Sequence, residues 1–224
     1  MNRRDFLGGA GALAALAAAG GARAESEQEA LVEKTIASLS HFLRDPDMTW
    51  FQSNVSRSRA ILIAPEIVKA GFIIGGSGGR AVLVARDRSG KWAGPVFYSL
   101  ATASIGFQAG LQVAEAATLV MTEKAFNSLL GTSMKFGGDA SIAAGPVGAG
   151  AKQEVVTDLV SFSRAKGLYG GLNLDGTVVS VSDEWNSAFY GKRASADEVL
   201  VKRSVSSPRA SRLLRAVAGG ASAR

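Results

Sequence analysis

Residues 60–85 read Ala60-Ile-Leu-Ile-Ala-Pro-Glu-Ile-Val-Lys-Ala-Gly-Phe-Ile-Ile-Gly-Gly-Ser-Gly-Gly-Arg-Ala-Val-Leu-Val-Ala85, and this stretch predicts the fold. Its three apolar runs are short and rich in Ile and Val, which is typical of buried strands. Pro65 ends the first run, and we expect it to begin a helical turn over residues 65–69. The glycine cluster at residues 75–79 separates the other two runs and predicts the turn of a β-hairpin.

The sequence that follows keeps this pattern of short apolar runs and glycines. Residues 92–114 contain no charged side chain, but Pro95 and two glutamines would be costly in a lipid-facing helix. We instead expect strands at residues 96–98 and 104–111 of a tightly curved sheet. Further strands are predicted at residues 117–121, 158–164 and 172–181, the last a hairpin that turns at Asp175-Gly176.

Helical patterns lie on either side of these runs and between them. Residues 25–44 place apolar side chains at spacings of three and four, with glutamates near the start. This amphipathic helix either covers the core of its own domain or contacts a membrane or a partner. Shorter helices are predicted at residues 122–130, 183–190 and 196–201 and from Ser207 onward. The predicted fold class is α+β: a strongly curved, mostly antiparallel β-sheet, barrel- or sandwich-like, with peripheral helices in a single domain.

The first 24 residues have the three parts of an export signal. Asn2-Arg3-Arg4-Asp5-Phe6-Leu7 is a twin-arginine motif, an apolar Ala, Leu and Gly stretch follows, and Ala22-Arg23-Ala24 is a small-x-small cleavage site. The apolar stretch falls short of the ~20 residues that a transmembrane helix requires. We therefore predict export to the periplasm by the twin-arginine route, with peripheral membrane association of the mature protein.

Composition excludes several classes of site. The chain has no cysteine and one histidine, so it cannot form a disulfide or a thiolate metal site, and a histidine-based triad or multi-histidine metal site is not expected. The whole chain carries 25 basic against 19 acidic residues, and 22 against 18 remain without residues 1–24. This mildly basic balance favours anionic partners such as phospholipid headgroups, and it is too weak to indicate nucleic acid.

No motif for catalysis is present in the sequence. The cluster at residues 75–79 is not followed by the Lys-Ser or Lys-Thr of a P-loop, nor by the helix of a dinucleotide site. Asp139 and Asp158 could supply carboxylates, but no serine elbow accompanies them. We therefore expect a protein that is not an enzyme and that uses no cofactor and no metal.

Basic residues next to aromatic ones are the candidate binding residues. Cations can meet headgroup phosphates while aromatic rings lie at the membrane boundary, although scattered solvated charges would give the same pattern. The candidate cations are Lys69, Arg80, Arg86, Arg88, Lys91, Arg164 and Lys166, and the candidate rings are Trp92 and Tyr169.

Six ordered blocks resemble the SYLF family of lipid-binding domains. They are residues 60–75, Lys91-Trp-Ala-Gly-Pro95, Ile105-Gly-Phe-Gln-Ala-Gly-Leu-Gln112, Phe136-Gly-Gly-Asp-Ala-Ser-Ile-Ala-Ala-Gly-Pro-Val-Gly148, Ser163-Arg-Ala-Lys-Gly-Leu-Tyr-Gly-Gly171 and Asn186-Ser-Ala-Phe-Tyr-Gly191. Together with the export signal and the helical patterns, the resemblance divides the chain into a twin-arginine signal peptide (1–24), an N-terminal amphipathic helical segment (25–55), a SYLF-like domain (56–205), and a C-terminal helix and flexible tail (206–224).

The resemblance implies non-catalytic binding of anionic phospholipids. In eukaryotic relatives the domain is associated with phosphoinositides, actin and a preceding amphipathic segment. Phosphatidylglycerol or cardiolipin would be the more sensible ligand in a periplasm, where actin is absent. Two alternatives remain: a structural or protein-interaction module of the cell envelope with a protein partner, and an enzyme with an unrecognised carboxylate site.

Overall fold

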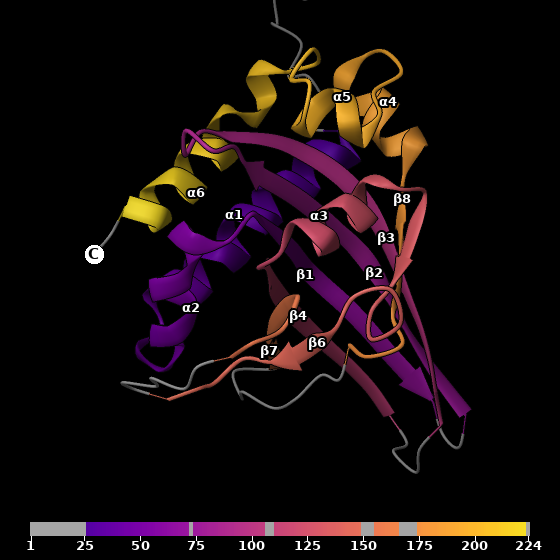
Figure 1. Cartoon of the computed structure of the whole chain (residues 1–224). Coiled ribbons are helices and arrows are strands. Elements are labelled where there is room, and N and C mark those ends of the chain that lie inside the picture. Colours follow the sequence, from indigo (N-terminus) through magenta and orange to yellow (C-terminus); the bar gives the residue numbers. More distant parts are fainter. Residues whose placement is uncertain (1–25, 72–73, 106–109, 149–154, 166–173, 223–224) are drawn as a thin grey trace, which may run out of the picture.

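The computed structural model describes residues 26–71, 74–105, 110–148, 155–165 and 174–222. A single eight-stranded sheet forms its centre and curls into a half-barrel (Figure 1). The strands, in the spatial order β5-β8-β3-β2-β1-β4-β7-β6, are Ser133–Lys135, Val178–Val181, Trp92–Ile105, Ile74–Arg86, Ala60–Gly71, Gly110–Val120, Leu159–Ala165 and Ile142–Ala144. Every neighbouring pair is antiparallel except β6 and β7. The α+β class and the curved, mostly antiparallel sheet are therefore confirmed.

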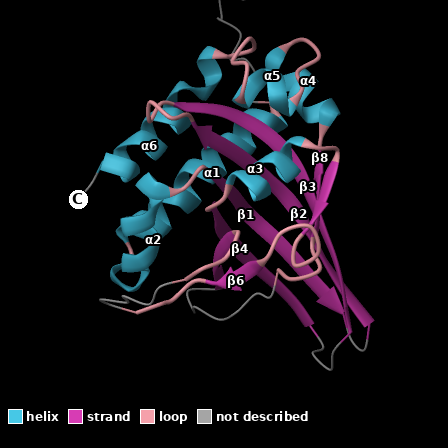
Figure 2. Cartoon of the chain, in the orientation of Figure 1, coloured by secondary structure: helices cyan, strands magenta, loops and turns pink. Residues whose placement is uncertain are grey.

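Helices cover both faces of the sheet (Figure 2). The six α-helices of the described residues are α1 Glu27–Arg44, α2 Thr49–Asn54, α3 Glu123–Leu130, α4 Asp183–Tyr190, α5 Ala196–Leu200 and α6 Ser211–Ser222. Alternate residues of the strands enter two cores, since Leu62 packs into one and Ile61 into the other. The first core is closed by α3 and α5, and the second by α1, α2, α4 and α6.

The amphipathic helix predicted at residues 25–44 is α1, and it covers the core of its own domain. A capping box begins it, in which the Ser26 hydroxyl accepts from the Glu29 N–H and the Glu29 carboxylate accepts from the Ser26 N–H. Its side chains Leu39 and Phe42 are each 1 % exposed. The helix packs against β1, β4 and α6. Its apolar stripe is therefore buried within the domain.

The shorter helices also match their sequence signals. Thr122 caps α3 by accepting a hydrogen bond from the Ala125 N–H at 3.2 Å, and Gly131 ends the helix.

The hairpin predicted at residues 172–181 is only partly described. Gly176 has a φ of 80° and precedes β8, whereas residues 172–173 lie outside the described residues.

The glycine cluster at residues 75–79 is not a turn, which corrects the prediction. It lies within β2 and pairs with residues 67–71 of β1. A Cβ atom on Gly79 would lie 2.4 Å from the carbonyl oxygen of Glu66, beside a register shift in β1. The prediction is wrong because glycine also permits the close approach of a neighbouring strand at a bulge.

Strand ends in two other places differ from the prediction. Residues 65–69 form no helical turn, because β1 continues through Pro65, where the register shift replaces regular pairing. Residues 104–111 are not one strand. Their first two residues end β3, their last two begin β4, and 106–109 lie outside the described residues. A run without charges gives no signal of where one strand stops and the next begins.

Candidate functional site

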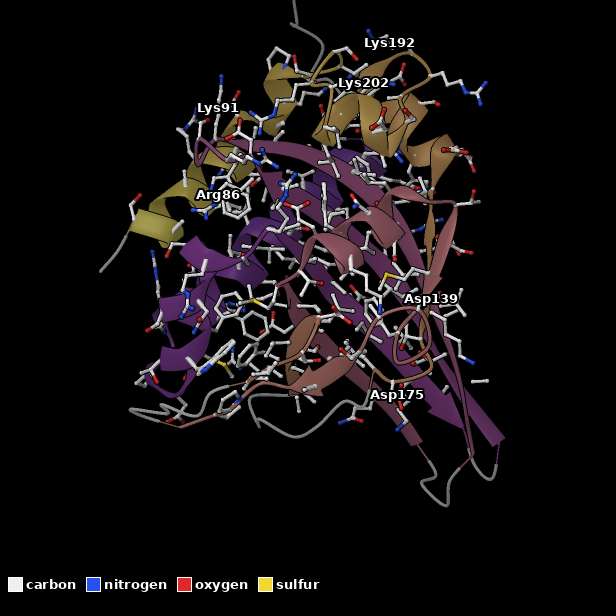
Figure 3. All side chains as sticks on the ribbon, viewed as in Figure 1. Arg86, Lys91, Asp139, Asp175, Lys192 and Lys202 are labelled. Carbon is white, nitrogen blue, oxygen red and sulfur yellow. The ribbon has the colours of Figure 1, made fainter. Side chains whose placement is uncertain are left out.

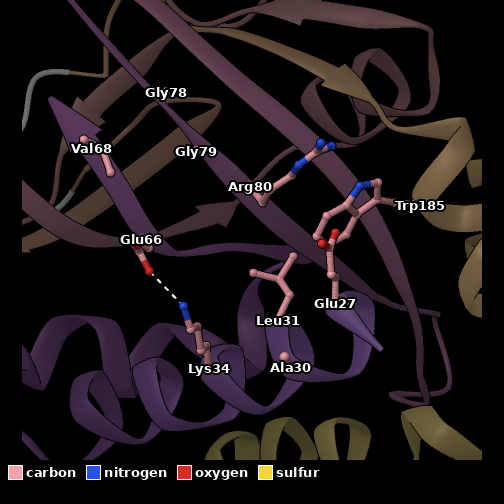
Figure 4. Close-up of a pocket in the computed structure, with 10 residues that line it drawn as sticks. All are labelled: Glu27, Ala30, Leu31, Lys34, Glu66, Val68, Gly78, Gly79, Arg80 and Trp185. Atoms are coloured by element: carbon pink, nitrogen blue, oxygen red, sulfur yellow. Dashed lines mark hydrogen bonds and ion pairs between the residues drawn. The ribbon is translucent and has the colours of Figure 1, made fainter. Parts of the chain in front are cut away.

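A pocket of about 390 Å³ opens between the first half of α1 and strands β1 and β2 (Figure 4). Leu31, Val68 and the indole ring of Trp185 supply its apolar walls. Gly78 pairs with Val68 in the sheet and therefore faces the same side, where it leaves room for the pocket. The pocket exists because this part of β2 lacks side chains.

The guanidinium of Arg80 is held in this pocket by neutral groups. Its Nη1 donates to the hydroxyl oxygens of Ser99 and Ser182, each at 3.0 Å. Its central carbon lies 4.3 Å from the ring centroid of Trp185, which is a cation–π contact. Among the described residues, no carboxylate oxygen lies within the 4.0 Å ion-pair distance of this guanidinium. Arg80 is therefore a half-buried, positioned cation that can accept an anionic group.

Three further charged side chains line the pocket. Lys34 and Glu66 neutralise one another, with Nζ and Oε2 2.9 Å apart. Glu27, the first residue of α1, is exposed and forms no ion pair within the described part of the chain. The pocket thus presents one unpaired cation and one unpaired carboxylate with apolar surface beside them.

A second feature is a concentration of positive charge at one end of the molecule. Residues 86–92 and 191–204 carry seven cations against three carboxylates. We call these cations the cationic end: Arg86, Arg88, Lys91, Lys192, Arg193, Lys202 and Arg203. In Figure 3 the labelled members lie in the upper part of the molecule, near α4, α5 and the turn between β2 and β3, while Asp139 and Asp175 lie toward the opposite end.

Arg203 joins the two segments of the cationic end. Its Nη2 donates to the Lys91 carbonyl oxygen at 2.6 Å, and its Nη1 lies 2.7 Å from a carboxylate oxygen of Asp87. The Ser89 hydroxyl is the largest cause that lowers the pKa of Asp87, and Arg203 adds to it. Lys202 pairs with Asp197 at 2.7 Å. Arg88, Lys91, Lys192 and Arg193 are exposed and form no ion pair within the described segments.

The nine candidate residues predicted from the sequence do not form one surface. Arg86, Arg88 and Lys91 lie together at the cationic end, whereas Arg80 lies in the pocket, six residues earlier in β2. Lys69 faces the other side of the sheet from Arg80, since it follows Ile67 of the first core by two residues.

The remaining candidates have structural contacts or fall outside the described residues. Trp92 is only 7 % exposed and packs in the second core, with Arg86 6.0 Å from its ring centroid. Arg164 lies 3.5 Å from Glu115, which also contacts His41 at 3.1 Å. Lys166 and Tyr169 lie outside the described residues.

The pocket and the cationic end contain residues that were not among the nine candidates. Lys192, Arg193, Lys202 and Arg203 form two basic pairs in the sequence, but sequence spacing could not show that they share an end with Arg88. Trp185 is separated by 105 positions from Arg80, so no local pattern connects them. Only the fold brings these groups together.

The two carboxylates considered for catalysis have structural partners. Asp139 accepts from the Lys135 N–H at 2.7 Å. Asp158 accepts from the Thr122 hydroxyl at 2.7 Å and from the Ser141 hydroxyl at 2.8 Å. In the described part of the chain, no group of three or more His, Cys, Asp or Glu side chains is arranged to hold a metal. None of its helices is long and apolar enough to cross a membrane.

The Ysc84 family, described as "Las17-binding protein actin regulator", matches residues 101–219, more than half of the chain. The chain belongs to the Ysc84 family, the family of SYLF domains. The resemblance predicted from the sequence blocks is therefore confirmed.

Relatives of the chain include yeast and vertebrate proteins. Protein YSC84 of Saccharomyces cerevisiae is 31 % identical over 157 residues, which are 66 % of this chain and 33 % of the relative. LAS seventeen-binding protein 3 of the same species is 32 % identical over 145 residues, 61 % of this chain and 31 % of the relative. SH3 domain-containing YSC84-like protein 1 of Xenopus laevis is 25 % identical over 175 residues, 76 % of this chain and 52 % of the relative. The chain thus spans about a third to a half of the length of these relatives.

Proposed function

We propose that this protein is a non-catalytic binding protein that recognises anionic phospholipid headgroups on a membrane surface. The observation that supports the proposal best is the cationic end, because residues 86–92 and 191–204 contain seven cations and only three carboxylates. Four of these cations are exposed and form no ion pair among the described residues, so their charge is available to a surface.

The magnitude of such an attraction is sufficient for reversible binding. Each Lys or Arg near an anionic membrane contributes about 1 kcal/mol, and the contribution falls off within a Debye length. Four exposed cations that approach one surface together would contribute roughly 4 kcal/mol before other contacts are counted. Binding of this kind is salt-dependent and does not require an inserted aromatic ring, which is consistent with the burial of Trp92.

Vesicle flotation tests the proposal. We expect the protein to float with vesicles that contain phosphatidylglycerol, more so as its fraction rises and less as salt increases. Arg88→Glu combined with Lys91→Glu reverses two exposed charges and is expected to weaken binding at least tenfold on the ~1 kcal/mol scale per charge.

A matched variant reverses two charges away from the cationic end. Arg44 ends α1 and Lys135 ends β5, and both are exposed. Arg44→Glu combined with Lys135→Glu gives the same net charge as the first variant and is expected to bind nearly as well as the unchanged protein. Equal loss in both variants, or equal binding to neutral and anionic vesicles, would refute headgroup recognition at this end.

A protein partner is the second candidate function, and the family description favours it. The family description names binding to Las17, and so does the name of the yeast relative LAS seventeen-binding protein 3. An acidic segment of an envelope protein would fit the same cationic end by charge. Absence of vesicle binding, together with retention of an envelope protein that Arg88→Glu with Lys91→Glu abolishes, would favour this function over the first.

We also propose export to the periplasm by the twin-arginine route. The support is the pattern of residues 2–24, which lie outside the described residues. Arg3→Lys combined with Arg4→Lys is expected to keep the protein in the cytoplasmic fraction, while Arg23→Lys leaves the motif intact and serves as the control. Periplasmic recovery of the double variant would refute this route.

A further inference from the structure

The Arg80 pocket carries a charge pattern that the cationic end does not have. Its unpaired groups are one guanidinium, on Arg80, and one carboxylate, on Glu27, while the other two charged lining residues neutralise each other at 2.9 Å. A purely anionic ligand would meet the carboxylate, and a purely cationic ligand would meet the guanidinium. A ligand that carries both charges satisfies both groups.

We propose that this pocket binds a compact zwitterion that joins an oxyanion to an ammonium group, with the oxyanion on Arg80 and the ammonium on Glu27. Phosphoethanolamine has this chemistry, either as a phospholipid headgroup or free in solution. The pocket lies six residues along β2 from Arg86, roughly 20 Å at the rise of a strand, so it is separate from the cationic end.

Arg80 is positioned in advance for an oxyanion. The two serine hydroxyls and the indole ring fix one nitrogen and one face of its guanidinium. Its Nε and Nη2 donate to no other described residue, so they are available to a ligand. A guanidinium held in this way loses little side-chain entropy when it forms charge-assisted hydrogen bonds.

The rest of the pocket fits the neighbouring part of such a ligand. The volume of about 390 Å³ lies within the range of small-molecule sites. Figure 4 shows Leu31 and Glu27 on one side of the pocket, on α1, and Val68 on β1 opposite, with Arg80 and Trp185 close together at one end. Val68 is 38 % exposed, so its apolar surface is available to glycerol carbons or to the start of an acyl chain.

Titration calorimetry with short-chain lipids below their micellar concentration tests the proposal. The probes are dihexanoyl phosphatidylethanolamine and dihexanoyl phosphatidylglycerol, which share chains and phosphate and differ in the ammonium group. We expect the ethanolamine lipid to bind more tightly. Glycerophosphoethanolamine, which has no acyl chains, distinguishes a lipid headgroup from a free zwitterion as the ligand. If it binds as tightly as the ethanolamine lipid, the ligand is the free zwitterion. If it binds much more weakly, the ligand is the lipid.

Three substitutions test the two charged groups and the volume of the pocket. Arg80→Met is expected to weaken ethanolamine-lipid binding roughly tenfold to a hundredfold, the range for hydrogen bonds to a charged group. Glu27→Gln is expected to weaken it about twofold to fivefold, because Glu27 is exposed, and to remove the preference over phosphatidylglycerol. Gly78→Val is expected to abolish binding by filling the pocket.

Gly78→Val keeps Arg80 and should preserve the fold. A Cβ atom on Gly78 would meet its nearest neighbour, the Leu100 carbonyl oxygen, at an ordinary 3.5 Å, and valine suits a strand. Ser77→Val, on the opposite face of the same strand, is the matched control for Gly78→Val, and Lys69→Met is the control for Arg80→Met.

The outcomes also separate this proposal from headgroup recognition at the cationic end. Arg88→Glu with Lys91→Glu should leave the calorimetric binding intact, and Gly78→Val should leave flotation with phosphatidylglycerol vesicles intact. Tighter binding of phosphatidylglycerol than of the ethanolamine lipid would overturn the zwitterion assignment, as would a Glu27→Gln variant that keeps the preference. Failure of the folded Gly78→Val variant to change binding would overturn the location.

Discussion

Gly145 shows at the scale of one residue why the segment at residues 136–148 is rich in glycine. A Cβ atom there would lie 2.0 Å from Cζ of Phe162, whose ring is 1 % exposed. That ring cannot retreat easily, because it packs edge-on against Phe51 with centroids 5.4 Å apart and lies 5.8 Å from the ring of Trp50. Gly145 is therefore required by packing.

Gly145→Ala is accordingly expected to destabilise the fold by roughly 1–3 kcal/mol, the usual cost of overpacking a core. Gly138→Ala, in the same segment, is the control, because its added Cβ would lie 3.5 Å from the flexible Lys135 side chain. Urea denaturation measures both variants. Equal midpoints for the two would contradict the packing argument.

The Asp158 carboxylate connects the start of β7 with two other elements. It accepts from the hydroxyl of Thr122, which caps α3, and from the N–H and hydroxyl of Ser141, which precedes β6. These hydrogen bonds, the one from Thr122 first, lower the pKa of Asp158 below its ordinary value, and Lys124 adds to them. The ionised carboxylate therefore stabilises the folded state more than the protonated carboxyl does.

The sign of the effect follows from the lowered pKa. A carboxyl whose pKa is lower in the folded state stabilises it above the unfolded pKa, and this contribution is lost as the pH falls through the folded pKa. Asp158→Asn is expected to cost on the order of 1 kcal/mol at pH 7, and the difference from the unchanged protein should shrink below about pH 4. Denaturation at pH 7, 5 and 3 measures it. A difference that is constant over this range would exclude a role for the charge.

At the scale of elements, α4 is fixed to the sheet by side chains that bond to backbone. Asn186 is 0 % exposed, its Oδ1 accepts from the Phe97 N–H at 2.9 Å, and its Nδ2 donates to the Phe97 carbonyl at 3.4 Å. Tyr190 donates its hydroxyl to the Pro95 carbonyl at 2.6 Å. The sequence motif at residues 186–191 therefore contains side chains that attach α4 to the backbone of β3.

Asn186→Ala leaves the Phe97 N–H buried without its partner. We expect a loss of about 1–3 kcal/mol in the free energy of unfolding, the cost of an unsatisfied buried polar group. Ser187→Ala, on the same helix and half-buried, should change it by less than about 0.5 kcal/mol. Thermal unfolding by circular dichroism measures both, and a stable Asn186→Ala variant would show that this attachment does not hold α4.

The helices were predictable because their signals are local, whereas the strand ends were not. Ser26 with Glu29, and Thr122 with Gly131, mark helix ends within a few residues. The glycines of β2 satisfy a contact with β1, and that contact depends on a bulge that no spacing reveals. Sequence patterns therefore gave the class of fold and the helices, but placed a turn where a strand continues.

At the scale of the whole molecule, the candidate sites depend on contacts between distant segments. Arg88 and Lys91 were predicted as binding residues, but their neighbours at the cationic end come from residues more than 100 positions later. The pocket joins α1, β1, β2 and α4 in the same way. The candidate cations could be named from the sequence. Which of them lie at the cationic end and which in the pocket could be seen only in the fold.

The position of α1 limits how the proposed binding to a membrane could occur. Detaching it would expose at least Leu31, Val32, Leu39 and Phe42, each 8 % exposed or less. At about 1.5–3 kcal/mol for each side chain, the cost is roughly 6–12 kcal/mol, comparable with the total stability of a typical domain. The apolar side chains of α1 could insert into a bilayer. The face of the sheet that α1 covers would then be left exposed to water.

We therefore expect the domain to bind anionic vesicles with α1 in place. Hydrogen–deuterium exchange should show unchanged protection over residues 27–44 when phosphatidylglycerol vesicles are added, with added protection at residues 86–92 and 191–204. Neutral vesicles are the control and should change neither region. Loss of protection in α1 together with β1 would mean that the helix inserts into the membrane, because its burial in the domain and its insertion exclude each other.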